Sequence, residues 1–583
     1  VWLAILLTSA ACPDPLSQPP CCTGRLSAAS WLMAESADAA GQAGVAVARS
    51  AGQRLMLVTR GTRGDAQPLV ALGLSLQAAG FAVRIVANTN LVPMMQSFGL
   101  DAVGVFADLE KRLREDPALR DAMAKGELLK SAQLVKEQDK HCFPGEFTSL
   151  VQAFSAWEPQ LLIATSLCTF EVQALAAARE IPCISAHYQY ISISKYQRSL
   201  LQERWASHLV CGVLCGRLGW STEFDVKAAV ILDQLPIAKP FVCSCFMEYM
   251  LQLQHPFTPS LVAFSPSMLQ PKDDWTEDCK KQVRIVGFWI VPESEQKART
   301  LQKDPAWGGE EIAAIEDFLV AGPAVYLGWG SVIIVPEAQM ACLAVRSLMQ
   351  AGLRGIIAAG WAKLSPEMLK NQPDSEAMQK YVKGNVLFIQ SAPHEWLFPK
   401  CSVIVHHGGA GTTAAAMRSG KPMVITPYWW DQFTNAEIVS ERGLGIGLEN
   451  LKKLEAKELA SALTTCVTDA AMIDRAKLFE ETVKAEQGLS RAVSIIDDFL
   501  ADEVASGKWR ASFERRKAEM AYLQSRRNPD FLRWLVGLPC NPRPTDFSVK
   551  LPPTASSLPS KPQSSQAPQT VGATDSVEEP LVL

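Results

Sequence analysis

Residues Cys401 to Gln432 read CSVIVHHGGAGTTAAAMRSGKPMVITPYWWDQ, and they contain a strand–turn–helix–strand pattern. The β-branched run Ser402 to His406 is typical of a buried parallel strand. A glycine turn follows it. The small residues from Thr412 to Arg418 then predict a helix, which a Gly and a Pro end. Met423 to Thr426 predicts the next strand, so this part of the chain is an α/β unit.

The glycine turn lies where the strand ends and the helix begins. Gly409, Gly411 and Thr412 therefore offer free backbone N–H groups at the positive end of a helix dipole, which favours an anion such as phosphate. His407 beside the turn can add a donor or a positive charge. The alternatives are a turn that only packs the helix on the strand and a buried histidine. His406 fits the structural role better, because it still belongs to the strand.

Asp431 and Gln432 follow the next predicted strand. Because the carboxyl ends of parallel strands meet at one edge of a sheet, we expect both side chains near the glycine turn. A carboxylate and an amide at that edge are suited to sugar hydroxyls.

These residues resemble the donor-binding motif of family 1 UDP-glycosyltransferases, most of all that of the sterol 3-beta-glucosyltransferase branch. Three further segments match that branch in the same order, which makes the resemblance specific. They are TRGTRGDAQPLVALGLSLQAAGF (Thr59 to Phe81), VYLGWGS (Val325 to Ser331) and APHEWLFPKC (Ala392 to Cys401). The resemblance covers about residues 54 to 500. It implies the α/β GT-B fold, with two Rossmann-like domains facing across a cleft and with disordered termini.

On the donor side, the resemblance implies that the second domain binds UDP-glucose as a co-substrate, with no cofactor and no metal. The helix N-terminus, a histidine and a serine hydroxyl would hold the diphosphate, the Ala392–His394 loop would hold uracil, and the acid–amide pair would hold the sugar. For Trp396 in that loop, a core position is an open alternative. The implied donor-binding residues are Ser331, Ala392, His394, His407, Gly409, Ala410, Gly411, Thr412, Asp431 and Gln432.

On the acceptor side, the resemblance points to Asp65 as the catalytic base, in the loop after the first predicted strand. In related glycosyltransferases with a GTRGD motif this Asp is the proposed base, and no His occupies the loop here. The alternative is that Asp65 only caps a helix that starts at Pro68. Arg63, Gly64 and His187 are also predicted on the acceptor side. Arg63 would bind the acceptor or Asp65, or would be solvated.

Two departures from the motifs of related enzymes can be seen, and the second leaves the acceptor open. The plant form of the donor motif has a Glu where this chain has Ala415, as the sterol branch tends to have. The sterol branch usually has a Pro-Trp-Thr-Pro-like segment where this chain has HYQYISISKY, His187 to Tyr196. A lipid acceptor, a sterol above all, is expected. The alternatives are a non-sterol lipid, a small aglycone, or a membrane-lipid-binding pseudoenzyme of the same fold.

A nicotinamide dehydrogenase is disfavoured, because the loop Gly61 to Gly64 is not GxGxxG and Asn88, rather than an acid, follows the second strand.

The composition of the chain limits the class of protein further. The chain has 583 residues with 48% hydrophobic and 20% charged residues, which suits a globular protein of two or three domains. Its net charge of −4 gives no global attraction to nucleic acid. Its 15 cysteines form no CxxC pairs, which predicts free thiols in the cytoplasm and no zinc.

The expected organisation places the two domains between termini of low periodicity. It comprises a disordered or mispredicted N-terminal segment (1–50), an acceptor domain (51–291), a linker (292–322), a UDP-sugar domain (323–487), C-terminal helices that cross back (488–538) and a disordered tail (539–583). The apolar start, Val1 to Cys12, lacks a basic n-region, so a secretory signal is disfavoured. Residues 506–538 are basic with interleaved aromatics. This pattern predicts either peripheral contact with an anionic membrane or a helix packed on the body.

Overall fold

The computed structural model describes residues 47–125, 127–189, 225–235, 258–270, 277–304, 307–333, 335–428 and 431–525. These residues belong to one compact unit, Val1–Arg527. A second unit, Asn528–Leu583, lies outside the described residues, as do 1–46 and most of the segment HYQYISISKY. The predictions of disorder at the two ends therefore concern residues that the structure does not describe.

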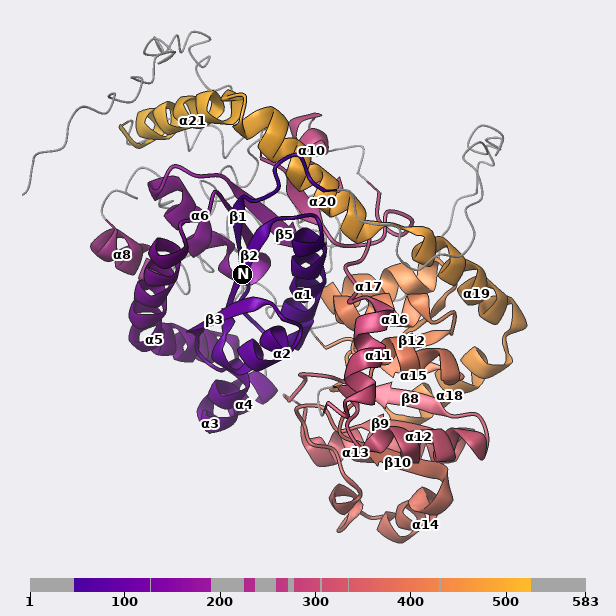
Figure 1. The fold of residues 1–583 in the computed structure, drawn as a ribbon. Helices are drawn as coiled ribbons and strands as arrows, with labels where there is room; N and C mark the ends of the chain where they lie inside the picture. Colours follow the sequence, from indigo (N-terminus) through magenta and orange to yellow (C-terminus); the bar gives the residue numbers. More distant parts are fainter. Residues whose placement is uncertain are drawn as a thin grey trace, which may run out of the picture. The chain divides into compact units, whose positions relative to one another are not determined.

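Seven parallel strands form the first sheet, in the order β3-β2-β1-β4-β5-β6-β7. The strands are β1 (Arg54–Val58), β2 (Ala82–Asn88), β3 (Asp101–Phe106), β4 (Leu161–Thr165), β5 (Cys183–His187), β6 (Ser260–Val262) and β7 (Val283–Ile285). Helices α1 and α2 lie on one face of the sheet, and α5 and α6 lie on the other (Figure 1). Because both faces are covered, the central strands are apolar throughout, as in LLIAT of β4.

The helices of this first domain follow the strands in the alternation that the sequence predicts. They are α1 (Arg63–Ala78), α2 (Val92–Ser97), α3 (Leu109–Glu115), α4 (Pro117–Lys125), α5 (Leu128–Trp157), α6 (Thr169–Ala178), α8 (Asp225–Gln234) and α10 (Glu277–Gln282), with short 3₁₀ turns η2 (Thr89–Leu91) and η3 (Ser166–Cys168). The sequence pattern missed β3. This strand is at the edge of the sheet, carries Gly104 and alternates in burial, so it lacks a continuous apolar run.

Six parallel strands form the second sheet, in the order β10-β9-β8-β11-β12-β13. They are β8 (Val325–Gly328), β9 (Gly355–Ala358), β10 (Val386–Ile389), β11 (Ile404–His406), β12 (Met423–Ile425) and β13 (Gly445–Gly447). Around them lie α13 (Glu337–Ala351), η8 (Pro366–Leu369), α14 (Ser375–Asn385), α15 (His394–Leu397), η9 (Phe398–Lys400), α16 (Ala410–Arg418), α17 (Asp431–Glu441), α18 (Ala456–Thr468) and α19 (Ala470–Ala485). Two parallel α/β sheets confirm the predicted fold class.

Each sheet has one point where the strand order reverses. In the first sheet it lies between β1 and β4, and in the second between β8 and β11. In open α/β sheets, ligands bind outside the carboxyl ends of the strands at such a point, because the loops there diverge. Asp65 follows β1 in the first turn of α1, and the glycine turn follows β11. The topology thus places both halves of the predicted site where this rule expects them.

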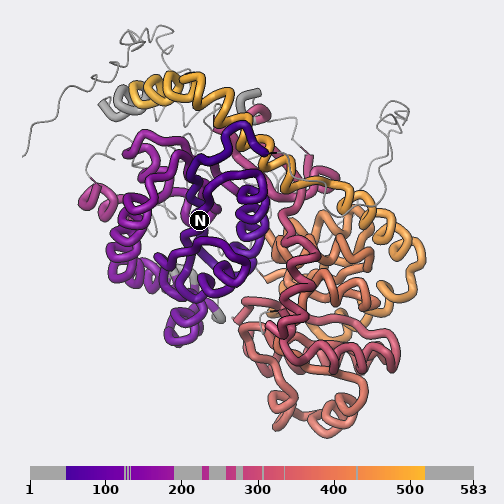
Figure 2. The backbone as a smooth tube through the Cα atoms, viewed as in Figure 1, coloured from indigo at the N-terminus to yellow at the C-terminus, as the bar shows by residue number. Residues whose placement is uncertain are grey.

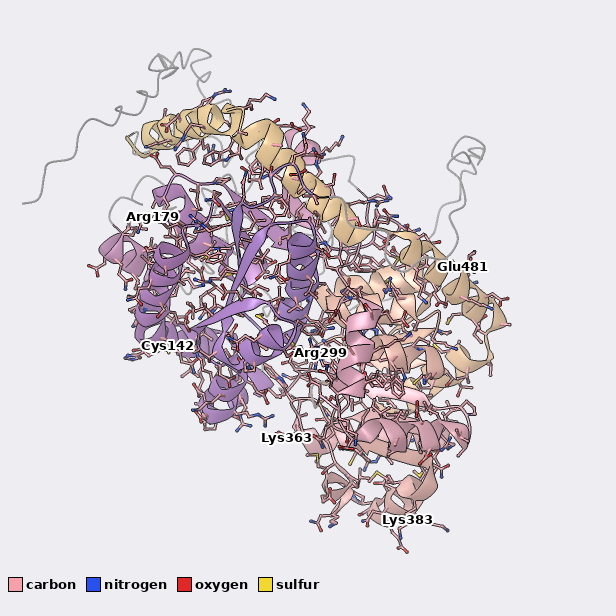
Figure 3. All side chains as sticks on the ribbon, in the orientation of Figure 1. Cys142, Arg179, Arg299, Lys363, Lys383 and Glu481 are labelled. Carbon is pink, nitrogen blue, oxygen red and sulfur yellow. The ribbon has the colours of Figure 1, made fainter. Side chains whose placement is uncertain are left out.

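The segment predicted as a linker is largely helical. It contains α11 (Glu293–Leu301) and α12 (Glu311–Val320), and between them Trp307 is buried in the core of the first domain. The Trp307 ring meets the Phe98 ring edge-on, with centroids 5.8 Å apart. The guanidinium of Arg299 on α11 lies 4.5 Å from the centroid of that Phe98 ring (Figure 3). The segment is therefore held to α2 by stacked aromatic and cationic side chains.

After α19 the chain returns to the first domain, as predicted. Helix α20 (Gly488–Asp498) packs against α1 and continues through a π-helical turn, η10 (Phe499–Val504), to α21 (Lys508–Ser525), drawn in yellow in Figure 2. Arg49, just before β1, pairs with Asp502 at 3.0 Å and also with Asp497. These contacts fix the start of the first domain to the end of the described chain.

Helix α21 covers the first part of residues 506–538, for which membrane contact and packing on the body were the two alternatives. Trp509 is 6% exposed and belongs to the core of the first domain, and Phe513 stacks on it with centroids 5.2 Å apart. Arg510 and Lys517 pair with Glu180 at 2.8 and 3.0 Å. The first part of the segment is therefore packed on the body, and its remaining aromatics, Phe531 and Trp534, lie outside the described residues. Among the residues that the structure describes, no helix is both long and apolar enough to cross a bilayer.

The cysteines that the structure describes are all free thiols. Cys168, Cys342, Cys401 and Cys466 are buried. Burial raises the pKa of each of these four thiols, to about 12 for Cys168, because a thiolate loses its hydration in the interior. They act as small apolar side chains of the core.

Candidate active site

The loop after β1 leads directly into α1, so Asp65 lies in the first turn of the helix rather than in the loop. Thr62 is the N-cap, and it forms a capping box with Asp65. Asp65 Oδ2 accepts hydrogen bonds from the Thr62 backbone N–H at 2.7 Å and from Thr62 Oγ1 at 3.1 Å. Pro68 lies inside the helix, so the expectation that the helix starts at Pro68 was wrong. The T-R-G-D spacing is itself an N-cap signature that places the start at Arg63.

The capping box does not use the whole Asp65 carboxylate, because both of its contacts go to Oδ2. Desolvation by the surrounding protein raises the pKa of Asp65, and the contacts with Thr62 oppose that rise. A carboxylate with a raised pKa is a better proton acceptor. Asp65 therefore combines a capping role with the properties of a base.

His187 ends β5 next to this loop, and it is 4% exposed. Its Nδ1 lies 3.0 Å from Ser166 Oγ, in the loop after β4. Burial lowers the pKa of His187 to about 3, so the imidazole is neutral at neutral pH. Leu167 beside Ser166 is 45% exposed, and it lies close to Gly61, where a Cβ would be 3.1 Å from Leu167 Cδ1.

Arg63 and Gly64, also predicted on the acceptor side, have different surroundings. The Arg63 guanidinium lies over the Trp307 ring, 4.8 Å from its centroid, and its Nε donates to Gln67 Oε1 at 3.1 Å. Burial lowers the pKa of Arg63 to about 10. Gly64 is exposed in the first turn of α1, and its N–H donates to Thr62 Oγ1 at 3.2 Å. Arg63 is thus held against the linker segment rather than solvated.

On the second domain, the glycine turn is built as the sequence predicts. Gly408 has a φ of +90°, and a Cβ there would lie 2.7 Å from Ile425 Cγ2, so only glycine fits. Gly409 is the N-cap of α16, without a side-chain cap. Gly411 is exposed, and a Cβ there would meet no atom of the described residues within 4 Å outside its own helix backbone. The first turn of α16 therefore presents uncapped N–H groups and open space, as an anion requires.

The two neighbouring histidines have different roles. His406 is fully buried at the end of β11, and its Nδ1 accepts a hydrogen bond from the Gly408 N–H at 3.0 Å. It shapes the turn, as its place in the strand predicts. His407 lies against Gly330, where a Cβ would be 3.2 Å from its Cε1, and a Cβ at Gly409 would collide with its Nε2. Burial lowers the pKa of His407 to about 4, so it is a neutral donor rather than a positive charge.

Ser331 follows β8 in a loop that the buried side chain of Trp329 holds in place. The indole N–H of Trp329 donates to Thr426 Oγ1 at 2.9 Å in the interior. Gly330, with a φ of +56°, brings the loop against His407, and its carbonyl accepts from the Trp361 N–H at 2.9 Å. Ser331 is half-buried and directly follows Gly330 in this loop.

His394 begins α15 after half-buried Ala392, and its ring stacks on Phe398 with centroids 4.4 Å apart. Its Nε2 lies 3.3 Å from Tyr326 Oη. Burial is the main cause that lowers the pKa of His394 to about 3, and the nearby charge of Arg63 contributes to the same shift. The His394 ring of the predicted uracil loop is therefore held by Phe398 and Tyr326.

Asp431 and Gln432 are the first residues of α17, one βα unit beyond the glycine turn. Gln432 Oε1 accepts from the Tyr428 N–H at 2.8 Å, which holds the loop after β12. Desolvation raises the pKa of Asp431 to about 7, and the charge of Asp65 raises it as well. The carboxylate predicted to hold the sugar therefore lies within electrostatic range of the predicted base.

Several contacts join the two groups of residues. Helix α1 packs against α16, and Ala410 of α16 packs against the core of the first domain. With its amide nitrogen turned to the acceptors, Gln189 donates to Asp431 Oδ2 at 2.8 Å and to Oδ1 at 3.3 Å. Tyr188 Oη donates to the Asp65 carbonyl at 2.8 Å. Sequence reasoning missed Tyr188 and Gln189, because their spacing matches no motif.

Among the described residues, no cluster of three or more His, Cys, Asp or Glu side chains is arranged to hold a metal ion.

Comparisons with known proteins agree with this architecture. Residues 363–490 match the family model described as the erythromycin biosynthesis protein CIII-like C-terminal domain. The chain is 28% identical over 451 residues to a sterol 3-beta-glucosyltransferase of Saccharomyces cerevisiae, which covers 76% of this chain and 34% of that protein. A sterol 3-beta-glucosyltransferase of Cryptococcus neoformans is 27% identical over 462 residues, 76% of this chain and 27% of that protein. The chain thus spans about a third of the length of the curated relatives it matches.

Two crystal structures show the same fold. The glycotransferase of kitacinnamycin has a TM-score of 0.52 and 18% identity, over 77% of this chain and 99% of that chain. The calicheamicin glycosyltransferase has a TM-score of 0.51 and 17% identity, over 77% of this chain and 98% of that chain. The predicted resemblance is therefore confirmed: residues 363–490 match the erythromycin biosynthesis protein CIII-like C-terminal domain, in a chain with the GT-B glycosyltransferase fold and sequence similarity to the sterol 3-beta-glucosyltransferases.

Proposed function

We propose that this chain transfers glucose from UDP-glucose to the hydroxyl group of a lipid, specifically a sterol, with inversion at the anomeric carbon. One observation carries the proposal: the predicted base Asp65 and the predicted sugar ligand Asp431 come from different domains, and two neighbouring residues contact them. Tyr188 Oη donates to the Asp65 carbonyl at 2.8 Å, and the Gln189 amide donates to Asp431 Oδ2 at 2.8 Å. A base beside a sugar site and an uncapped helix N-terminus is the arrangement that glycosyl transfer to a hydroxyl needs.

The proposed reaction is a single displacement. The acceptor hydroxyl oxygen attacks the anomeric carbon from the side of Asp65, and its proton passes to the Asp65 carboxylate as the new C–O bond forms. The bond between the anomeric carbon and the diphosphate oxygen breaks, and its electron pair leaves with UDP. The N–H groups at Gly409 to Thr412, with His407 and Ser331, would receive the developing negative charge. Attack opposite the leaving group converts the α-linked donor into a β-glucoside.

We propose that the transfer proceeds without a metal ion. The support is the first turn of α16, where N–H groups lack a side-chain cap and a Cβ at Gly411 would meet open space. A helix N-terminus stabilises an anion by hydrogen bonds and by its dipole. In metal-dependent enzymes, Mg²⁺ stabilises the negative charge of the diphosphate in the same way.

For the acceptor, the support is an apolar surface together with the names of the relatives. Leu167 is 45% exposed beside the loop that leads to Asp65, where a flat apolar molecule could lie. A small aglycone or a non-sterol lipid is the second candidate, because the segment after β5 differs from the sterol branch. The test is UDP release from UDP-glucose with sterols, other lipid alcohols and small phenols. Release with sterols supports the proposal, and release with phenols alone supports the alternative. No release with any acceptor supports the pseudoenzyme.

Asp431→Ala is expected to weaken the binding of UDP-glucose by about 10- to 100-fold, because a hydrogen bond to a charged group contributes about 1.5–3 kcal/mol. The affinity for UDP should stay the same, since Asp431 is assigned to the sugar. Calorimetric titration with each ligand measures both affinities. Equal losses for UDP and UDP-glucose would contradict the assignment.

Peripheral membrane contact is proposed for the residues after Ser525, because Trp509 and Phe513 are packed in the body. Deleting residues 526–583 should lower binding to anionic liposomes several-fold and leave activity on a soluble acceptor intact. Deleting residues 506–583 should also lower the thermal stability, since it removes the buried indole of Trp509. Liposome flotation measures the binding. Flotation of the 526–583 deletion equal to that of the full chain would reject the membrane role.

A further inference from the structure

Residues 187–189 bring the first domain into contact with Asp431. They continue β5 beyond its last residue, His187, and so leave the sheet at its carboxyl edge. Each side chain in turn meets one part of the site: His187 meets Ser166, Tyr188 meets the carbonyl of Asp65, and Gln189 meets Asp431.

The position of this segment is well fixed. Tyr188 is 9% exposed, and its ring meets the Trp289 ring edge-on with centroids 6.1 Å apart. Its hydroxyl donates to the Asp65 carbonyl at 2.8 Å. Gln189 therefore directly follows an anchored residue, and its amide reaches Asp431 from that fixed point.

The two hydrogen bonds from Gln189 occupy the carboxylate that the proposed function assigns to the sugar. An amide nitrogen has two N–H donors, and here it lies 2.8 and 3.3 Å from the two Asp431 oxygens. Two neighbouring hydroxyls of a hexose would offer the same pair of donors to the same pair of acceptors. The amide of Gln189 thus imitates a bound sugar diol.

We propose that Gln189 occupies the sugar-binding carboxylate of Asp431 in the sugar-free protein, and that the donor hexose must displace it. This inference rests on the proposed function. It makes Gln189 a positioning residue that sets the affinity for the sugar part of the donor and couples sugar binding to the acceptor domain. Displacement moves the segment that also holds Tyr188 against Asp65.

The competition predicts an unusual direction of effect. Gln189→Ala removes the competitor, so UDP-glucose should bind about 2- to 10-fold more tightly, the range for one hydrogen bond exchanged against another. The affinity for UDP, which lacks the sugar, should not change. Gln173→Ala is the matched control. Its amide comes from α6 of the same domain and donates to Ser185 Oγ at 3.2 Å, and it should alter neither affinity.

A double-mutant cycle by calorimetry makes the test specific, with UDP and UDP-glucose as probes. Adding Gln189→Ala to Asp431→Ala should leave UDP-glucose affinity unchanged, because the contested carboxylate is gone. Weaker or unaltered binding of UDP-glucose by Gln189→Ala alone would overturn the inference, as would equal gains for both ligands. A wild-type chain that binds neither ligand would instead overturn the proposed function, and the two failures are therefore distinguishable.

Discussion

Replacing Asp65 by Asn is expected to lower turnover by about 10²–10⁴-fold, the range that a positioned general base contributes. An alcohol is a poor nucleophile at neutral pH, and its proton must leave as the bond to the anomeric carbon forms. Asp65 lies in the first turn of α1 beside Leu167 and within electrostatic range of Asp431. Turnover is measured as UDP released per enzyme at saturating donor and acceptor.

The same variant should leave folding and donor affinity almost unchanged. Asn has the size of Asp, and its side-chain oxygen can still accept the hydrogen bond from the Thr62 N–H that closes the capping box. Thermal unfolding and UDP titration check both points. If Asp65 only caps the helix, Asp65→Asn should turn over at nearly the wild-type rate.

Thr62→Ala is the control that separates the two roles. It removes the other half of the capping box, which costs about 1 kcal/mol of stability, and keeps the carboxylate. A loss of turnover in Thr62→Ala as large as in Asp65→Asn would assign the effect to helix position. Wild-type turnover in Asp65→Asn would move the search for a base to His187, whose imidazole is neutral and bonded to Ser166.

The base also predicts the pH dependence. Desolvation raises the pKa of Asp65, so the carboxylate takes up a proton at a higher pH than an exposed aspartate does. Activity should therefore be highest at neutral and higher pH, and should fall as the pH drops through that raised pKa. Protonation of Asp431 should lower the activity over a similar pH range. Its pKa is about 7, so below neutral pH the carboxylate that would accept hydrogen bonds from the sugar hydroxyls becomes protonated.

Gly411→Val is expected to weaken the binding of both UDP and UDP-glucose by about 100-fold or more. At least two charge-assisted hydrogen bonds to the diphosphate would be blocked, at about 1.5–3 kcal/mol each. The structure explains why folding should survive. A Cβ at Gly411 would meet no described atom within 4 Å outside its own helix backbone, so valine would not clash with the protein. Its side chain would instead occupy the open space where the diphosphate is proposed to bind.

Gly145→Val is the matched control for this substitution. Gly145 also lies in a helix, α5, and a Cβ there would likewise meet nothing within 4 Å. Any effect of valine on helix propensity is shared by the two variants, while only Gly411 lies at the glycine turn. Calorimetric titration should show wild-type affinities for Gly145→Val. Normal UDP affinity in Gly411→Val would move the diphosphate away from α16.

Much of the fold could be predicted from local sequence. The central strands of both sheets are buried on both faces, so each has an apolar run that any periodicity analysis finds. The turn at Gly408 to Gly411 needs glycines for steric reasons, and this requirement is visible in the sequence. The edge strand β3 was missed because only three of its six residues are buried and Gly104 interrupts it.

The candidate site was only partly predictable. The residue types at Asp65 and Asp431 follow from their motifs, although both were expected in loops and lie in the first turns of helices. Their proximity does not follow from any local pattern, because it depends on how two separate sheets meet. Gln189 shows this limit most clearly, since a lone glutamine after a strand has no signature and only the folded chain places it on Asp431.

The central claim is a single-displacement glucosyl transfer to a sterol hydroxyl. We would incubate the EDTA-treated protein with UDP-glucose and a 3β-hydroxysterol, isolate the product and determine its anomeric configuration by proton NMR. The account predicts a sterol β-glucoside, formed at the same rate whether or not Mg²⁺ is restored. An α-glucoside, or product that forms only after Mg²⁺ is added back, would contradict it.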